Sequence, residues 1–443
     1  MFIVMLIAVA LPLSGAAQQS QSATIEQARS VLAAAAAGEF ARIEAQFTAE
    51  MTAALPAGRL AAMWTGLQRQ AGPFKSCSTK PRITEIADKR MVITPCQFAL
   101  ASVDVQFAFD SAGKIAGMSF RPAAPPPMPS AMPPYATPAS YTETTMMIGS
   151  GEWALPAILA MPHGKERLAA VVLVHGSGPQ DRDLTIGPNR PFRDLATGLA
   201  SRGIAVLRYD KRSKVHGARM AAVANATVRE EVIEDVLHAV TLLRAHPRID
   251  AARIFVLGHS FGGMLTPRIS AADPAIAGLI VLAGAARPLE DALVAQSRYL
   301  AAADGTISTD EQRGIDQAVA LGNDIRTLTA ADAKSGRMVA GTPASYWLDL
   351  RGYDPTSGAR QVKAPMLILQ GERDYQVTMD EFAKWKAALG SRADITFRSY
   401  PALNHLFIAG SGASLPAEYQ RPGHVAESVI RDIAAWITSL TPA

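Results

Sequence analysis

The chain has 443 residues, of which 49% are hydrophobic and 19% are charged, and its formal net charge is +4. A chain of this length and composition predicts two or three globular domains with ample cores. The small net charge, and the lack of a Lys/Arg cluster interleaved with aromatic residues, argue against nucleic acid as a partner.

The chain begins with an apolar run, MFIVMLIAVALPL, which the small residues SGAAQ follow. A membrane span needs about 20 apolar residues, so we expect no stable membrane insertion of the mature chain. The pattern is typical of a secretory signal peptide, which we expect over residues 1–17, although no Lys or Arg precedes the run. We therefore expect an exported protein, periplasmic or secreted. A buried helix is the alternative interpretation.

A small α+β domain is expected over residues 18–121. Apolar residues at helical spacing run from Thr24 toward Leu67, and the segments RITEI, MVITPCQFAL, ASVDVQFAFD and KIAGMSF predict antiparallel strands. The chain's two cysteines, Cys77 and Cys96, lie in this domain. In an exported protein they predict a disulfide, worth about 3 kcal/mol, with two buried thiols as the alternative. Two cysteines cannot complete a tetrahedral zinc site.

A proline-rich linker is expected over residues 122–140, because residues 122–138 hold eight prolines and no charge. Beyond it, apolar runs alternate with amphipathic segments, which predicts a mostly parallel, doubly wound α/β sheet over residues 141–443. An antiparallel hairpin is expected around Gly151, and a final helix over residues 425–440. The 81 residues from Gly284 to Ala364 exceed a single crossover, so we expect a helical cap insertion at about 285–362.

Ser260 is the predicted nucleophile. It lies in Gly258-His259-Ser260-Phe261-Gly262, where a strand ends and a helix begins, and the two glycines allow the sharp, strained turn that exposes a reactive hydroxyl. A tight turn with an idle serine is the alternative.

A serine nucleophile needs a histidine base and an acid that orients the histidine. Of the eight histidines, only His405 and His424 follow Ser260. His405, in the loop after the last apolar run, is the predicted base, whereas His424 is expected to cap or pack the final helix. Asp374, at the end of LILQGERD, is the predicted acid, and Glu372 is expected to be a solvated or loop-bracing charge.

Ser177 lies in Gly176-Ser177-Gly178, after the first parallel strand, VVLVH. In this early loop a backbone N–H faces the nucleophile, so we expect the N–H groups of Ser177 and Phe261 to form the oxyanion hole. Six charged residues follow the first two parallel strands, and an ion-paired network that braces the loop is favoured over substrate contact: Asp181, Arg182, Asp183, Asp210, Lys211 and Arg212.

With these motifs, the chain from about Tyr141 to Ala443 resembles the α/β-hydrolase superfamily. The motifs G-H-S-F-G, G-E-R-D and N-H occur in the family's order. The loop H-G-S-G-P-Q-D-R-D, followed by G-I-A-V-L-R-Y-D-K-R, is similar to a bacterial serine esterase group whose members carry an N-terminal domain of unknown function (DUF3887-like). The resemblance implies no metal and no organic cofactor.

The sequence as a whole predicts a serine hydrolase, and most simply a carboxylesterase that cleaves short acyl esters through an acyl-enzyme on Ser260. A serine exopeptidase, aminopeptidase-like or prolyl-oligopeptidase-like, is the enzymatic alternative. It would need a carboxylate for the substrate amine, for which Glu290, Asp310 and Glu311 are candidates. A non-catalytic binding protein is a third hypothesis. The sequence predicts no oligomeric state.

Overall fold

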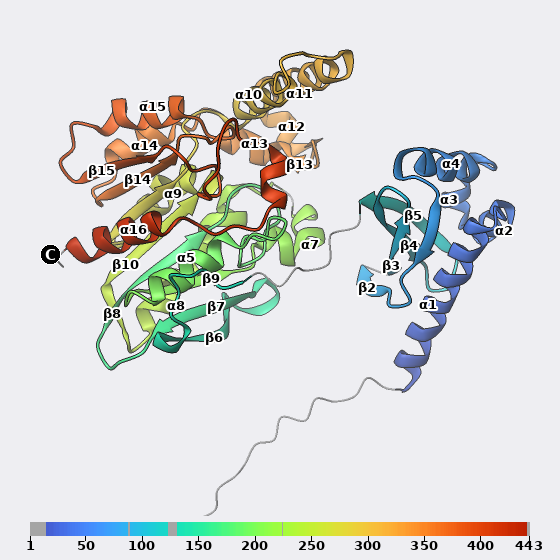
Figure 1. The fold of residues 1–443 in the computed structure, drawn as a ribbon, viewed down its shortest axis with the longest axis horizontal. Coiled ribbons are helices and arrows are strands. Elements are labelled where there is room, and N and C mark those ends of the chain that lie inside the picture. The colour runs from blue at the N-terminus through green and yellow to red at the C-terminus, as the bar shows by residue number, and fades with distance from the viewer. Residues whose placement is uncertain (1–14, 87–88, 123–130, 224, 441–443) are drawn as a thin grey trace, which may run out of the picture. The chain divides into compact units, whose positions relative to one another are not determined.

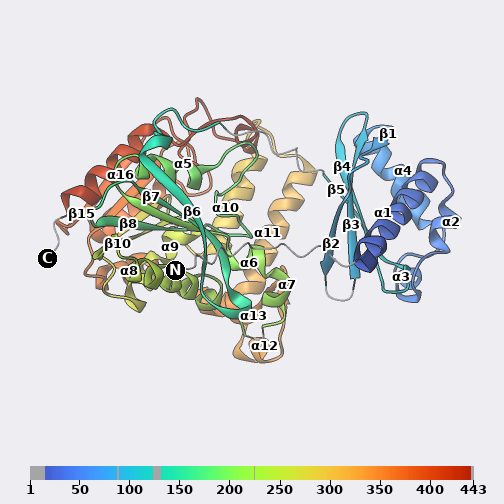
Figure 2. The same ribbon diagram turned by 90° about the horizontal axis from the view of Figure 1, so that it is seen from below.

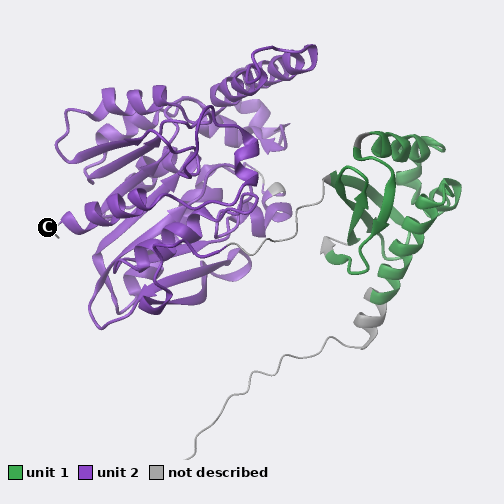
Figure 3. Ribbon diagram, in the orientation of Figure 1, with its two compact units in different colours: residues 1–126 green, residues 127–443 purple. Residues whose placement is uncertain are grey.

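The computed structural model describes residues 15–86, 89–122, 131–223 and 225–440. The chain divides into two compact units, Met1–Pro126 and Pro127–Ala443, which Figure 3 colours separately. Most of the predicted signal peptide, residues 1–14, and residues 123–130 of the predicted linker lie outside the described residues. A search of the described helices finds none that is long and apolar enough to cross a membrane.

In the described part of the first unit, helices pack against one antiparallel sheet (Figure 1). Its helices are α1 (Gly15–Ala36), α2 (Phe40–Glu44), α3 (Ala49–Ala54) and α4 (Arg59–Ala71), and its strands are β1 (Phe74–Cys77), β2 (Arg82–Ile86), β3 (Lys89–Phe98), β4 (Ser102–Phe109) and β5 (Ile115–Pro122). Alternate residues of β3 are buried from Val92 to Phe98, as expected for a strand with one face on a core. Trp64 of α4 closes that core against Phe98 and Phe74, with ring centroids 5.8 and 5.7 Å apart.

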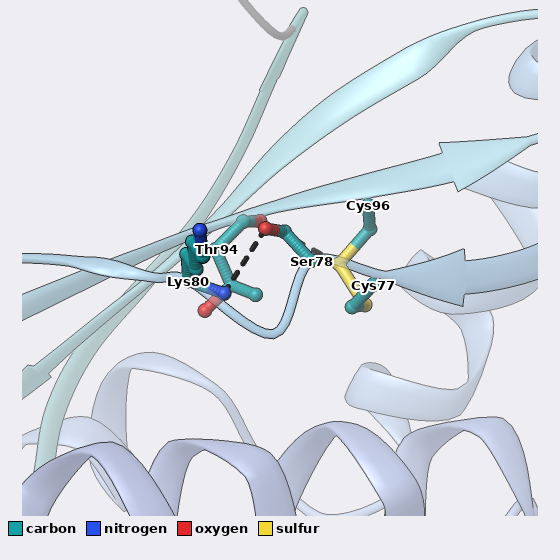
Figure 4. Close-up of a disulfide and its surroundings, with 5 residues drawn as sticks. All are labelled: Cys77, Ser78, Lys80, Thr94 and Cys96. Atoms are coloured by element: carbon teal, nitrogen blue, oxygen red, sulfur yellow. Dashed lines mark hydrogen bonds between the residues drawn. A yellow bond between two sulfur atoms is a disulfide. The ribbon is translucent and has the colours of Figure 1, made fainter.

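Strand β1 was not among the predicted strands, because four residues with a central lysine carry no readable alternation. It pairs with β3 so that Cys77 lies directly opposite Cys96. The two cysteines form a disulfide (Figure 4), which ties this short edge strand to the middle of the sheet.

The second unit is built on an eight-stranded sheet with the order β15-β14-β11-β10-β8-β9-β7-β6. Its strands are β6 (Tyr141–Ile148), β7 (Leu155–Pro162), β8 (Leu168–Val174), β9 (Ala205–Tyr209), β10 (Ile249–His259), β11 (Gly278–Leu282), β14 (Met366–Gly371) and β15 (Ile395–Tyr400). The hairpin β6–β7 is antiparallel and joins β9 in antiparallel fashion, whereas the other neighbours are parallel. The predicted fold class is confirmed.

Helices cover both faces of this sheet, so β11 and β14 are buried at every residue and β8 at all but its first. Helices α5 (Pro191–Ala200) and α16 (Glu427–Ser439) lie on one face, and α8 (Glu234–Ala245) and α9 (Phe261–Ala272) on the other (Figure 2). The other elements of this unit outside the segment between β11 and β14 include the short helices α6 (Arg212–Val215) and α7 (Gly217–Ala221), the π-helical turn η3 (Arg229–Ile233) and α15 (Met379–Leu389). The remaining short turns are η1 (Pro138–Ser140), η2 (Gly151–Trp153) and η4 (Pro416–Gln420).

The segment between β11 and β14 is mostly helical. It comprises α10 (Leu289–Ala301), α11 (Thr309–Thr327), α12 (Ala330–Lys334), β12 (Met338–Val339), β13 (Thr342–Pro343), α13 (Ala344–Leu350) and α14 (Pro355–Gln361). Helices α10 and α11 lie side by side (Figure 1). The cap has a small core of its own, which includes Ile325, Val339 and Trp347. Helix α14 instead packs against α9 and α15 of the sheet layer.

Candidate active site

Ser260 occupies the turn between β10 and α9 with φ +56° and ψ −117°. A residue with a side chain pays about 1–3 kcal/mol for such a backbone conformation, which persists only where its surroundings enforce it. Two hydrogen bonds do so here: Ser260 N–H donates to the Leu282 carbonyl (2.9 Å), and Met264 N–H donates to the Ser260 carbonyl (3.0 Å). The hydroxyl is therefore presented at the carboxyl edge of the sheet.

The glycines of the motif are required by close packing. A Cβ at Gly258 would lie 2.3 Å from the Gly262 carbonyl oxygen, and a Cβ at Gly262 would lie 2.5 Å from the His175 carbonyl oxygen. Gly263 is equally tight, because its Cβ would lie 2.8 Å from Gly284 Cα. Strand β10, helix α9 and the loop after β8 can meet at Ser260 only because these positions lack side chains.

His405 and Asp374 form a buried pair. His405 Nδ1 lies 2.6 Å from Asp374 Oδ2. The other carboxylate oxygen, Oδ1, accepts the backbone N–H groups of Gln376 (2.8 Å) and Val377 (3.0 Å). A carboxylate only accepts hydrogen bonds, so the facing His405 Nδ1 carries the proton and Nε2 is left free as a base.

His259 links this pair to the turn at Ser260. Its Nε2 lies 2.9 Å from the His405 carbonyl oxygen, and the two imidazole centroids are 4.6 Å apart. Burial, reinforced by the neighbouring His405, lowers the pKa of the His259 imidazole to about 3. His259 therefore stays neutral, and its ring packs against His405 one residue before Ser260.

Ser177 follows β8 on an exposed bend, and Gly176 before it approaches the serine turn closely. A Cβ at Gly176 would lie 3.2 Å from Ser260 Cβ. Phe261 begins α9, one residue after Ser260, so its N–H lies in the first turn, where helical N–H groups lack intrahelical acceptors. The two predicted oxyanion donors thus lie on the two segments that meet at Ser260.

A cavity of about 620 Å³ opens between this edge of the sheet and the cap. Ser177 and Phe261 line it from the sheet, and Leu289, Leu293 and Trp347 line it from the cap. Trp347 also belongs to the small core of the cap, where its Nε1–H donates to the Val339 carbonyl (3.1 Å). Trp347 therefore belongs both to the core of the cap and to the wall of the cavity.

The charged residues after the first two parallel strands brace the loop, which is the favoured interpretation. Arg182 pairs with Asp210 at 2.7 Å, and Asp181 Oδ1 accepts the backbone N–H groups of Asp183 (3.1 Å) and Thr185 (2.9 Å). The other three charged residues form ion pairs with residues outside the group of six. Asp183 pairs with Arg208 of β9 (2.8 Å), Arg212 pairs with Asp235, and Lys211 pairs with Glu231 (3.1 Å).

The alternative candidates for the base, the acid and the amine-binding carboxylate make contacts away from the His405–Asp374 pair. His424 Nδ1 contacts Asp194 (3.2 Å), and Glu372 accepts a hydrogen bond from Ser399 Oγ (2.7 Å). Asp310 is exposed and Glu311 is half-buried in the first turn of α11, where Glu311 completes a capping box with Ser308.

Sequence reasoning missed two polar contacts. Gln370, inside the buried strand β14, donates from Nε2 to Asp374 Oδ2 (3.2 Å) and to the Val377 carbonyl (2.7 Å). A polar residue in an otherwise apolar run was the available signal. The second is the contact of Lys211 with the Gly176 carbonyl oxygen, because the sequence placed Lys211 among the charges expected to brace the loop but did not indicate this partner. Within the described ranges, no group of three or more His, Cys, Asp or Glu side chains is placed to hold a metal ion.

The fold and this arrangement define a hydrolase of the α/β-hydrolase class. The family described as "Serine aminopeptidase, S33" matches residues 165–410, more than half of the chain, and the chain belongs to this family. Residues 28–118 match a second family, described as a protein of unknown function (DUF3887).

Among characterised relatives, Esterase EstD of Thermotoga maritima is 36% identical over 388 residues, which cover 88% of this chain and 89% of EstD. Solved structures are more distant. The Pyrococcus horikoshii acylaminoacyl peptidase is 14% identical, with a TM-score of 0.45, over 82% of this chain and 50% of the peptidase. Est1E from Butyrivibrio proteoclasticus is 17% identical, with a TM-score of 0.43, over 67% of this chain and 99% of Est1E.

Proposed function

We propose that the protein is a serine carboxylesterase that hydrolyses small acyl esters, with Ser260 as nucleophile, His405 as general base and Asp374 as the residue that orients the imidazole. The observation that carries the proposal is the buried His405–Asp374 pair (2.6 Å), which His259 joins through the His405 carbonyl to the turn that holds Ser260 at φ +56°. The alignment with an esterase along nearly the whole of both chains supports it.

The proposed reaction has two halves. His405 Nε2 takes the proton of the Ser260 hydroxyl while the oxygen attacks the ester carbonyl, and the oxyanion that forms accepts N–H bonds from Phe261 and Ser177. The intermediate collapses as His405 returns the proton to the departing alcohol, which leaves an acyl-serine. Water, deprotonated by His405, then attacks the acyl carbonyl and releases the acid. No metal or organic cofactor is needed.

The family's description makes an aminopeptidase the second candidate. An exopeptidase needs a free carboxylate to bind the substrate amine. The acidic residue in the cavity lining, Glu231, is engaged by Lys211 (3.1 Å) and by the Tyr346 hydroxyl (2.5 Å). The three cap carboxylates Glu290, Asp310 and Glu311 are not among the residues that line the cavity in the described part of the chain. These contacts favour the esterase.

We further propose the organisation expected from the sequence: a signal peptide over residues 1–17, an N-terminal domain over 18–121, a linker over 122–140, and a catalytic domain over 141–443 with its cap at about 285–362. The loop HGSGPQDRD assigns the protein to the bacterial esterase group that carries such a loop. Export to the periplasm or the medium is supported by the Cys77–Cys96 disulfide, because such bonds persist in oxidising compartments.

The test compares two serine variants of the full chain. Ser260→Ala should abolish turnover of p-nitrophenyl butyrate and labelling by a fluorophosphonate. Ser177→Ala is the matched control and should keep most of the activity, because its backbone N–H remains. An active Ser260→Ala variant would refute the assignment of the nucleophile. Faster hydrolysis of aminoacyl-p-nitroanilides than of p-nitrophenyl esters would favour the peptidase.

A further inference from the structure

Lys211 is a buried cation that directly contacts the loop after β8. Its Nζ donates to the Gly176 carbonyl oxygen (2.9 Å), and its side chain is 3% exposed. Its backbone N–H donates to the Gln180 carbonyl (3.0 Å), so the residue holds the loop at two points. The proposed reaction gives Lys211 no role, although the contact lies next to the Ser177 N–H that is proposed to bind the oxyanion.

Peptide geometry connects this contact to the oxyanion hole. The Gly176 carbonyl and the Ser177 N–H belong to one planar trans peptide, in which the C=O and N–H bonds point in opposite directions. A donor that fixes the carbonyl oxygen therefore fixes the direction of the N–H. A cationic donor also polarises the amide and strengthens the hydrogen bond that the N–H can donate. Gly176 lies against Ser260, so this direction matters where the oxyanion forms.

Lys211 is itself held in place from two sides. Its Nζ pairs with Glu231 Oε1 (3.1 Å) of η3, and the hydroxyl of Tyr346, on α13 of the cap, donates to Glu231 Oε2 (2.5 Å). Burial alone would raise the pKa of the Glu231 carboxyl, but the Lys211 ammonium and the Tyr346 hydroxyl outweigh it and lower that pKa. The carboxylate is therefore ionised and keeps the ammonium at the Gly176 carbonyl.

We propose that Lys211 is a positioning residue for the oxyanion hole: it orients the Gly176–Ser177 peptide so that the Ser177 N–H points at the oxyanion, and Glu231 and Tyr346 hold Lys211 at that carbonyl. The inference rests on the proposed esterase mechanism. It predicts that loss of Lys211 weakens binding of the tetrahedral intermediate and leaves binding of the ground-state ester nearly unchanged.

The test is the double variant Lys211→Met/Glu231→Gln, which removes the donor without leaving a buried carboxylate unpaired. Loss of one oxyanion donor costs about 10²–10³ in kcat, and a misdirected donor should cost about 10- to 100-fold. We expect kcat for p-nitrophenyl butyrate to fall by this factor with KM nearly unchanged. The Ki of an alkyl boronic acid, which mimics the tetrahedral intermediate, should rise by the same factor. A merely structural role would not produce this parallel change.

The matched control is Arg212→Met/Asp235→Asn, which removes the neighbouring buried ion pair and should leave kcat and Ki within about threefold. Equal losses in the two double variants, or an unchanged Ki for the boronic acid, would overturn the inference. If the Lys211 double variant does not fold, Glu231→Gln alone should lower kcat a few-fold, raise the Ki of the boronic acid by the same factor and leave KM nearly unchanged. A Glu231→Gln variant with unchanged kcat and Ki would also overturn the inference. A wild-type protein without esterase activity would instead refute the proposed function.

Discussion

Replacing Asp374 with asparagine probes the proposed triad with almost no change in volume. Oδ1 of Asp374 accepts the backbone N–H groups of Gln376 (2.8 Å) and Val377 (3.0 Å), so the oxygen of the new amide must stay there. Its NH₂ group must then occupy the Oδ2 position, 2.6 Å from His405 Nδ1. Two donors cannot face each other at this distance, so the imidazole moves its proton to Nε2 and can no longer accept the serine proton.

The wrong tautomer sets the size of the effect. In serine hydrolases with a Ser-His-Asp triad, replacing the aspartate with asparagine lowers kcat about 10⁴-fold, which corresponds to an increase of about 5 kcal/mol in the activation free energy. We expect a loss of this size in kcat for p-nitrophenyl butyrate at pH 7.5. The melting temperature should stay within a few degrees, because both backbone hydrogen bonds to Oδ1 remain and Gln370 Nε2, which loses its contact with Oδ2, keeps its hydrogen bond to the Val377 carbonyl. Glu372→Gln, two residues earlier in the same loop, is the control and should remain active. A folded Asp374→Asn variant with more than a tenth of wild-type kcat would refute the reasoning.

Three further predictions follow from the structure. Burial, reinforced by the Lys211 charge, lowers the pKa of His175 to about 4. Between about pH 6.5 and 4 the unfolded chain therefore binds a proton that the folded chain does not, and the free energy of unfolding decreases as the pH is lowered. His175→Gln should flatten this fall between pH 6.5 and 4 by about 1.4 kcal/mol per pH unit in urea unfolding, and parallel curves would contradict the assignment. Reduction of Cys77–Cys96 should destabilise the N-terminal unit by about 3 kcal/mol, and both cysteines should resist alkylation until the disulfide is reduced; free thiols in protein recovered from an oxidising compartment would show that the bond does not form. Leu293→Trp should fill part of the cavity and lower kcat/KM for decanoate esters more than for butyrate, by about fourfold for each excluded methylene, whereas an unchanged ratio would mean that this cavity does not bind the acyl chain.

Much of the fold was predictable because its signals are local. Continuous apolar runs such as that at the end of β10 are typical of strands that are covered on both faces, and the final helix, expected over residues 425–440, is observed at Glu427–Ser439. The glycines around Ser260 are a similar case, because the backbone contacts that exclude a Cβ at Gly258 lie within the same short turn. Strand β1 was missed, since its pairing with β3 depends on a partner strand and a disulfide, not on its own four residues.

The sequence by itself determined the order of the candidate triad, since only two histidines follow Ser260 and each candidate follows its own strand of a parallel sheet. Only the tertiary structure decided which charges act on the site. Asp374 and Glu372 are two residues apart in one loop, yet one faces His405 and the other Ser399. Lys211 is one of six charges that looked alike in the sequence, and its contact with Gly176 joins residues 35 positions apart. A parallel sheet gathers the ends of distant strands at one edge, and the packing there decides which side chain reaches which atom.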